Sequence, residues 1–315
     1  MRDLVLGLDI GGTSSRAQVG DLSGRLVGSG DAGGGNPNSH PPEDAVAQVT
    51  AAARAALGDL DGSAVGSAVL GMAGVSAMTD PRVAGLFEQG WNSLGLHCPV
   101  RIVSDCEVAF AAGTAAGAGT VLIAGTGAIA ARIEGHREVA SAGGHGWLLG
   151  DEGSAFWLGR EAVRHALRTL DTGTAPEGLA RAVLVTALDG EPGDEPVRVR
   201  KQLITAVNGA PPIRLAELAP LVTAACADGN PAGADIVGRA AVELAGTAVR
   251  AGGSGPVVLA GGLTAEGNPV GTALRAELGA RLPGTPLHLA GPGAAGAAWL
   301  AALDLTPDAP RYPGI

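Results

Sequence analysis

The first indication of the fold is at residues 4–13, which read Leu-Val-Leu-Gly-Leu-Asp-Ile-Gly-Gly-Thr. An apolar run that ends in a glycine pair is typical of a buried strand followed by a tight turn. A second strand is predicted at residues 14–21 and a third at residues 25–29. Because no helical segment separates these strands, the chain begins with a β-meander and not with a strand–helix unit.

The same plan recurs after Gly119. Residues 120–124 form an apolar run, Gly125-Thr126-Gly127 is a turn, and two further strands are predicted at residues 128–133 and 137–141. The two segments share little identity but one layout, in which an apolar strand is followed by a Gly/Thr hairpin and a returning strand. A repeat of this size predicts two related units.

Helices and strands alternate through the rest of the chain, as hydrophobic periodicity and helix start signals indicate. A mostly helical region is expected between the two halves of the second unit, at residues 152–252. The expected helices cover residues 43–57, 80–91, 106–118, 234–249, 268–282 and 293–303, and the expected strands cover residues 64–71, 100–104, 256–260 and 286–290. The pattern indicates an α/β protein.

The net charge and the single lysine argue against two classes of protein. The 315 residues include 21 Lys and Arg against 31 Asp and Glu, and this net charge of −10 argues against a nucleic-acid partner. The single lysine, Lys201, has no glycine-rich loop before it, so a P-loop is absent. A small anion held by backbone amides and a metal ion remains compatible with this charge.

The chain has the features of a cytoplasmic protein. Cys98, Cys106 and Cys226 show no paired spacing, which favours a reducing compartment over a disulfide framework. No signal peptide is evident at the N-terminus. Residues 108–131 are uncharged and long enough to span a membrane, but they consist mostly of Ala, Gly and Thr. We therefore interpret them as a helix, a turn and a strand, and expect no membrane partner.

The first glycine hairpin could hold phosphate. Gly11 and Gly12 let backbone N–H groups approach an anion without a Cβ in the way, and Thr13 adds a hydroxyl donor. Asp9, at the strand end, suits a Mg²⁺ ion with its water shell. A glycine pair is, however, also ordinary in a hairpin turn.

Gly125-Thr126-Gly127 forms the second such hairpin. Residues 125–130 also match a dinucleotide-binding fingerprint, which requires a helix to follow. Residues 128–133 alternate like a strand instead. We therefore expect two phosphate hairpins that face each other across a cleft.

Asp105 ends an apolar strand and precedes a helix. A carboxylate there could lie in a cleft between domains and accept a proton from a sugar hydroxyl. Alternatively, Asp105 caps the helix that begins at Cys106, which is the role that spacing alone favours. Glu107 is close in sequence but is expected to point elsewhere on the helix.

Polar and aromatic residues gather in the glycine-rich segment at residues 143–154. Trp147, Asp151 and Glu152 suit a sugar site, because an aromatic face packs on the ring and carboxylates bind hydroxyls or an amine. Alternatively, Asp151 or Ser154 caps the helix that follows.

Two shorter segments leave functional and structural roles open. The loop at residues 33–38 carries Asn36 and Asn38, either of which binds a polar ligand or stabilises a turn. Gly261 and Gly262 follow a strand, and they either lie under a purine ring or turn the chain.

Five motifs occur in the order in which N-acetylglucosamine kinases and their relatives carry them. They are Asp9-Ile-Gly-Gly-Thr, Ser104-Asp105, Gly125-Thr126-Gly127, Gly150-Asp151-Glu152-Gly153-Ser154 and Ala260-Gly261-Gly262. Over nearly its whole length, the chain thus resembles this family of the actin-like, sugar-kinase ATPase superfamily. The Asn36 segment and the run at residues 106–113 are most similar to actinobacterial glucosamine kinases.

The resemblance implies an α/β fold of two ribonuclease-H-like domains around a hinged cleft. We expect residues 1–107 to form the smaller domain, joined by the last helix at about 293–315, and residues 108–292 to form the larger one. Analogy with the relatives also suggests a homodimer. The sequence lacks the cysteine clusters of the zinc-binding repressor/open-reading-frame/kinase branch and of the iron–sulfur activators of acyl-CoA dehydratases.

The resemblance further implies ATP as phosphoryl donor, Mg²⁺ as cofactor and an amino sugar as acceptor. Asp9 would hold magnesium through water, and Asp105 would contact the sugar and act as general base on its 6-hydroxyl. The remaining ATP ligands would be Gly11, Gly12, Thr13, Thr126, Gly127, Gly261 and Gly262, and the remaining sugar ligands would be Asn36, Trp147 and Asp151. The expected product is glucosamine 6-phosphate; an N-acetylglucosamine kinase, or a sugar-sensing ATPase without transfer, is the alternative.

Overall fold

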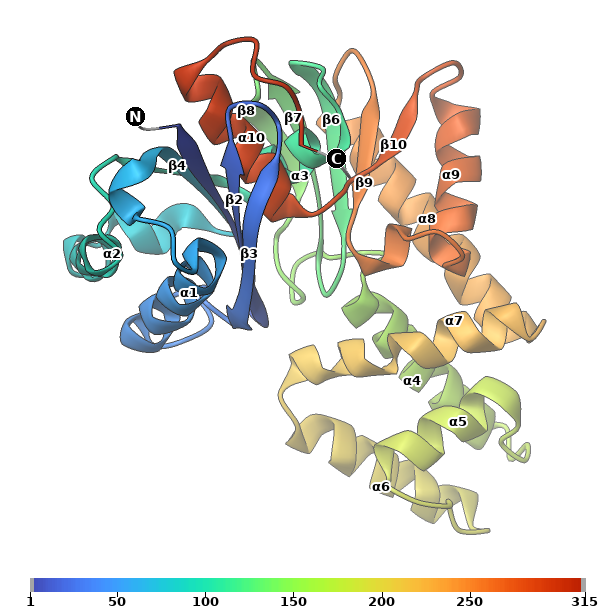
Figure 1. Ribbon diagram of the computed structural model, residues 1–315. Helices are drawn as coiled ribbons and strands as arrows, with labels where there is room; N and C mark the ends of the chain where they lie inside the picture. The colour runs from blue at the N-terminus through green and yellow to red at the C-terminus, as the bar shows by residue number, and fades with distance from the viewer. Residues whose placement is uncertain (1–2, 313–315) are drawn as a thin grey trace.

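The computed structural model describes residues 3–312, which form two five-stranded sheets with helices packed on their faces (Figure 1). The first sheet has the strand order β3-β2-β1-β4-β5. The antiparallel strands β1 to β3 are neighbours, whereas β4 and β5 run parallel to β1. The strands are β1 (Leu4–Ile10), β2 (Ser14–Asp21), β3 (Leu26–Gly33), β4 (Val65–Met72) and β5 (Val100–Ser104).

The second sheet repeats this topology strand for strand, with the order β10-β9-β6-β7-β8. Again three antiparallel strands are followed by two that run parallel to the first of them. The internal repeat predicted from the sequence is therefore confirmed. The strands are β6 (Ala118–Ala124), β7 (Ala128–Glu134), β8 (Arg137–Gly143), β9 (Val257–Ala260) and β10 (Leu287–Leu289). Because a strand and not a helix follows the second hairpin, the dinucleotide-binding alternative is wrong.

Two helices, α1 (Pro42–Leu57) and α2 (Pro81–Ser93), cover one face of the first sheet (Figure 1). They share a core with the sheet that includes Leu8 and Phe87. The start of α2 agrees with the Asp-Pro signal, because the side chain of Asp80 accepts a backbone N–H in its first turn.

Two further helices, α3 (Asp105–Gly113) and α10 (Gly293–Leu305), lie between the sheets (Figure 1). Val108 of α3 belongs to a core with the first sheet and α10, whereas Phe110 belongs to a core with the second sheet. The two helices cross so closely that a Cβ on Gly296 would lie 2.2 Å from the carbonyl oxygen of Val108. Both sheets are therefore connected through this helix pair.

The expected domain boundary at residue 107 falls inside α3, which contacts both cores. The last helix shares a core with Val5 and Val69 of the first sheet. It also packs on Gly7 of β1, where a Cβ would lie 2.1 Å from the backbone nitrogen of Ala298. On this packing we propose that residues 1–107 and the last helix form one domain and that residues 108–292 form the other.

A helical region is inserted between β8 and β9 and projects beyond the sheets (Figure 1). Its longest helices pack on the second sheet through a core that includes Leu122, Leu158 and Leu244. The region contains α4 (Ala155–Asp171), α5 (Gly178–Ala187), α6 (Pro196–Gly209), η3 (Pro212–Leu218), α7 (Ala219–Ala227) and α8 (Pro231–Ala251), and α9 (Pro269–Arg281) follows β9. Within residues 3–312, none of the helices is both long and apolar enough to cross a membrane.

The predicted helix at residues 106–118 is too long. It ends at Gly113, where a Cβ would lie 2.4 Å from a methyl group of Val258 in β9. Residues 118–124 instead form β6, which pairs with β9 and β7. Alanine-rich composition predicts a helix locally, but pairing with distant strands decides the outcome here.

Candidate functional site

The candidate site lies where α3 begins beside the turn between β6 and β7. A cavity of about 330 Å³ contains the predicted base, part of the second hairpin and one predicted sugar ligand. A larger cavity of about 640 Å³ adjoins it, because four residues line both of them. The shared residues are Gly74, Asp105, Ile129 and Gly144, and the first cavity is also lined by Thr126, Gly127 and Asp151.

The first hairpin, between β1 and β2, exposes two residues at its tip. The N–H of Gly11 donates to the carbonyl of Ser14 (2.8 Å), so this amide closes the turn. Gly12 and Thr13 are exposed, and the carbonyl of Gly12 accepts a hydrogen bond from Nε2 of His40 (2.6 Å). Neighbouring amides in such a turn can bind phosphate oxygens. Gly12 and Thr13 are thus better placed for this role than Gly11.

The second hairpin is held by the first turn of α4. The amides of Ala155 and Phe156 donate to the carbonyls of Gly125 (2.8 Å) and Thr126 (3.2 Å). These bonds direct both carbonyls toward α4, while Thr126 remains exposed and lines the cavity. The hairpin can therefore present donors to an anion.

Asp151 also holds the second hairpin in place, through a hydrogen bond to its backbone. Its Oδ1 accepts the N–H of Ala128 (3.1 Å), and a Cβ on Gly127 would lie 3.0 Å from its Oδ2. It adopts a φ of 60°, a region that non-glycine residues seldom occupy. Burial raises the pKa of this carboxyl, which is 7% exposed. The cap of α4 is Ser154, whose Oγ accepts the N–H of Trp157 (3.2 Å).

Asp105 does not cap α3, so that alternative is wrong. The cap is the preceding Ser104, whose Oγ accepts the N–H of Glu107 (3.3 Å). Asp105 is the first residue of the helix, and its Oδ1 accepts the adjacent N–H of Cys106 (3.0 Å). Because a neighbour serves as the cap, the carboxylate of Asp105 is available to the cavity that it lines.

Asp9 and Asp105 lie near enough for their charges to interact, although Asp9 is not in the lining of either cavity. Burial raises the pKa of Asp9, and the charge of Arg16 partly offsets that effect. Burial, and then the negative charges of Asp9 and Glu138, raise the pKa of Asp105 to about 6. Such a carboxyl is mostly ionised at neutral pH and is a stronger base than an ordinary aspartate.

The residues near Asp9 fit magnesium held together with a nucleotide. In nucleotide sites Mg²⁺ is bound by one or two carboxylates, with water and phosphate oxygens completing its shell. Asp9, which lies in β1 just before the first hairpin, supplies one such carboxylate. Among residues 3–312, no cluster of three or more His, Cys, Asp or Glu could hold a metal ion. Asp9 thus fits a cation whose other ligands are phosphate oxygens and water.

Asn36 uses its amide to hold the wall of the cavity. It is 5% exposed, its Nδ2 donates to the carbonyl of Ala73 (2.8 Å), and its Oδ1 accepts the N–H of Asn38 (2.9 Å). Nδ2 of Asn38 in turn donates to the carbonyl of Gly74. Ala73 and Gly74 line the cavity, so both asparagines shape it, and a sugar contact of Asn36 stays a prediction.

Trp147 lies in the loop that leads from β8 to α4. Its ring is 37% exposed and lies 5.7 Å from the ring of Phe156, measured between centroids. The following Leu148 and Leu149 are 73% and 77% exposed. Trp147 is absent from the lining of both cavities, so its stacking on a sugar stays a prediction.

The two glycines after β9 differ in their surroundings. Gly261 has a φ of 90°, and a Cβ there would lie 2.3 Å from the carbonyl oxygen of Ala124 in β6. Gly262 faces open space. Close packing of the strands therefore requires Gly261, whereas Gly262 offers a free backbone face. Contact of either glycine with adenosine stays a prediction.

The expectation that Glu107 points elsewhere than Asp105 is wrong, because both line the larger cavity, and sequence reasoning missed Glu138 in the same lining. Oε1 of Glu107 accepts the N–H of Glu138 (3.2 Å), whereas its Oε2 is buried without a hydrogen-bond partner. Burial raises the pKa of Glu107. The nearness of Glu107 to Asp105 in sequence was a signal, but only the fold brings β8 beside α3.

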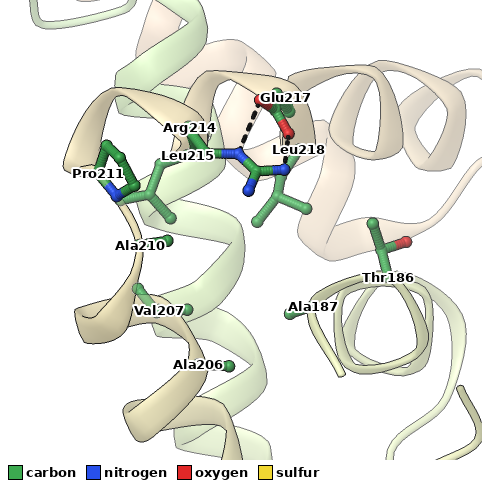
Figure 2. Close-up of a pocket in the computed structure, with 10 residues that line it drawn as sticks. All are labelled: Thr186, Ala187, Ala206, Val207, Ala210, Pro211, Arg214, Leu215, Glu217 and Leu218. Carbon is green, nitrogen blue, oxygen red and sulfur yellow. Dashed lines mark hydrogen bonds and ion pairs between the residues drawn. The ribbon is translucent and has the colours of Figure 1, made fainter. Parts of the chain in front are cut away.

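A third cavity, of about 200 Å³, lies in the helical region between α5, α6 and η3 (Figure 2). Its described lining is mostly apolar, and its two charged residues neutralise each other. Nε and Nη2 of Arg214 each donate to the carboxylate of Glu217 at 3.1 Å. With its charges paired and the glycine hairpins elsewhere, this cavity is a poor candidate for phosphate chemistry.

Two curated relatives match parts of the chain. An N-acetylmuramic acid/N-acetylglucosamine kinase of Clostridium acetobutylicum is 28% identical over 169 residues, which cover 53% of this chain and 54% of that protein. An N-acetyl-D-glucosamine kinase of Dictyostelium discoideum is 35% identical over 108 residues, or 33% of each protein. The matches thus span about half and a third of the relatives.

Solved structures match over nearly the full length. A protein of Chromobacterium violaceum, provisionally named an N-acetylglucosamine kinase, superimposes with a TM-score of 0.73 at 25% identity, over 95% of this chain and 99% of that one. A ROK family glucokinase of Streptomyces griseus, solved with glucose and AMPPNP, gives 0.57 at 22% identity, over 96% and 98%. The predicted two-domain sugar-kinase fold is confirmed.

The family assignment rests on a match that spans most of both sheets and the whole helical region. It includes the second hairpin, Asp105 and the segment with Asp151, and it begins two residues after the start of β1. The chain belongs to the BadF/BadG/BcrA/BcrD ATPase family, whose model matches residues 6–301.

Proposed function

We propose that this protein is an ATP-dependent kinase that phosphorylates the 6-hydroxyl of an amino sugar of the N-acetylglucosamine class. The observation that carries the proposal is the cavity that Asp105 shares with Thr126 and Gly127. It combines a base with a turn suited to phosphate. The names of the relatives in C. acetobutylicum and D. discoideum support this choice of sugar.

In this mechanism Asp105 accepts the proton of the sugar hydroxyl as the oxygen attacks phosphorus. Its pKa of about 6 leaves it mostly unprotonated at neutral pH, and it is basic enough to take up the proton. Phosphoryl transfer needs in-line positioning and charge neutralisation more than covalent chemistry. A single positioned carboxylate is therefore a sufficient catalytic group on the acceptor side.

The two hairpins would hold the phosphates from opposite domains. Gly12 and Thr13 would act from the first sheet, and Thr126 and Gly127 from the second. When bound, magnesium would neutralise charge on the phosphate oxygens next to Asp9. Because Lys201 lies in α6 of the helical region, the hairpin donors must supply the remaining stabilisation in place of a P-loop lysine.

A sensor that hydrolyses ATP without transfer would keep both hairpins, and Asp105 could then act on water instead of a sugar hydroxyl. The larger cavity of about 640 Å³ next to Asp105 has room for an acceptor, which favours a transferase. Sugar in the cavity would also displace the water that could otherwise attack ATP.

Glucosamine is a second candidate acceptor because of one observation. The titratable residues that line the larger cavity, Asp105, Glu107 and Glu138, are all acidic. They would attract a protonated amine, whereas a neutral acetamido group gains nothing from them. The same charges would repel the carboxylate of N-acetylmuramic acid.

A panel of acceptors tests the proposal. ADP release would be measured with Mg-ATP and N-acetylglucosamine, glucosamine, N-acetylmuramic acid or glucose, and the phosphorylated position identified by NMR. We expect the highest kcat/KM with N-acetylglucosamine; a higher value for glucosamine would select the second candidate. Equal ADP release with and without every sugar would overturn the assignment as a kinase.

A further inference from the structure

We propose that Gly293, the first residue of α10, is a positioning residue that sets the place of the Asp9 carboxylate. A Cβ on Gly293 would lie 2.4 Å from Oδ2 of Asp9 and 2.7 Å from its Cγ. No real Cβ contact is this short, so a side chain on residue 293 and the carboxylate of Asp9 cannot keep their present positions together. The inference rests on the role proposed for Asp9 in binding Mg-ATP.

The comparison with two other glycines shows why Gly293 is special. A Cβ on Gly7 would meet the backbone nitrogen of Ala298, and a Cβ on Gly296 would meet the backbone oxygen of Val108. Those positions cannot adjust without moving a strand or a helix. At Gly293 the two nearest atoms, Oδ2 and Cγ, belong to a carboxyl group that can rotate while the backbone stays in place, and the Cβ of Asp9 lies 3.2 Å away.

The segment that leads into α10 is also anchored by two backbone hydrogen bonds. The N–H of Ala290 donates to the carbonyl of Leu259 in β9 (2.9 Å), and the N–H of Gly291 donates to the carbonyl of Ala112 in α3 (3.0 Å). Because these bonds fix the segment before Gly293, an added methyl group displaces the carboxylate and not the helix.

The backbone of Asp9 cannot move to make room for a side chain at residue 293. Asp9 belongs to β1, whose backbone pairs with β2 on one side and β4 on the other. Only the carboxylate can therefore move, away from the position it holds beside the first hairpin. The contact lies within the proposed first domain, although bonds to β9 and α3 anchor the segment that precedes Gly293.

The test is a double-mutant cycle between Gly293→Ala and Asp9→Ala, with Gly279→Ala on α9 as the matched control. A Cβ on Gly279 would face open space. Thermal unfolding is followed without nucleotide or metal. We expect Gly293→Ala to lower the midpoint in the wild-type background but not in the Asp9→Ala background, where the obstructing carboxylate is gone.

The second measurement is the Mg²⁺ concentration that half-saturates ATP binding, followed by calorimetry. Gly293→Ala should raise it at least tenfold and lower kcat by at least tenfold, with the KM for sugar changed less than threefold. Gly279→Ala should leave all three values within twofold of the wild type.

Two outcomes would overturn the proposal. One is an equal loss of thermal stability in both backgrounds, which would show a purely structural role for Gly293. The other is an unchanged Mg²⁺ requirement in Gly293→Ala. Because unfolding and nucleotide binding need no sugar, the cycle remains informative even if the proposed kinase reaction proves wrong.

Discussion

Replacing Asp105 by Asn should abolish phosphoryl transfer and at the same time stabilise the folded protein. Asn keeps the acceptor oxygen for the N–H of Cys106, a bond that Oδ1 of Asp105 makes at 3.0 Å. It removes a negative charge that burial, Asp9 and Glu138 all disfavour. The substitution thus separates the contribution of this residue to catalysis from its cost in stability.

The size of the effect follows from the shift in pKa. Asp105 titrates near 3.8 when unfolded and at about 6 when folded. Each pKa unit corresponds to about 1.4 kcal/mol, so the ionised carboxylate costs the folded state roughly 3 kcal/mol. Because the folded pKa is the higher one, this cost is present in full above about pH 6 and vanishes below about pH 4.

Denaturant unfolding at several pH values measures this difference. We expect Asp105→Asn to raise the free energy of unfolding by about 2 to 3 kcal/mol at pH 8, and the gain to shrink toward zero as the pH falls to 4. ATP binding, measured by calorimetry, should persist. A variant that is less stable than the wild type at pH 8, or that retains a tenth of the transfer rate, would refute the reasoning.

Three further predictions concern neighbouring residues. The acid limb of the pH profile of kcat/KM should have its midpoint near pH 6. Glu138→Gln should move this midpoint to lower pH, because Glu138 raises the pKa of Asp105. An unchanged midpoint would show that Glu138 does not affect the pKa of Asp105. Asp151→Ala should lower kcat at least tenfold, while Asp151→Asn, which keeps an acceptor for the N–H of Ala128, should retain more activity in the same assay. Gly261→Ala should lower the free energy of unfolding by about 2 kcal/mol, since its Cβ would meet a backbone oxygen of β6. Denaturant titration measures this change, and an unchanged free energy of unfolding would contradict the prediction.

The repeated sheets were predictable because their signals are local. An apolar run, a glycine turn and a returning strand lie within twenty residues in each unit, and the strand at residues 14–21 begins and ends as predicted. The reversal of chain direction needs no distant contact. The same is true of the start of α2, where Asp80 and Pro81 specify the cap by themselves.

Other features could not be predicted, for different reasons. Ser104 and Asp105 are both good caps, and sequence cannot decide between adjacent candidates. The end of α3 depends on Val258, far along the chain, which fills the space beside Gly113. For Asn36, sequence gave the residue type but not its bonds to the cavity wall. The nearness of Glu138 to Asp105 likewise required the fold.

The two units differ at the residues that precede their hairpins, although the strands are equivalent in order. In the first unit, Asp9 of β1 pairs with Arg16 of β2 just before the hairpin. At the equivalent position of the second unit, Ile123 of β6 pairs with Ile129 of β7.

The ends of the last strands differ in the same way. β5 is followed by Asp105, whereas its counterpart β10 is followed by Ala290. The second unit has thus kept the turn that suits phosphate and lacks both carboxylates. If phosphate is held from both sides but deprotonation occurs on one, the acceptor must approach from the side of Asp105. Asp105 lines both cavities. We propose that the larger one, which Glu107 and Glu138 also line, holds the sugar.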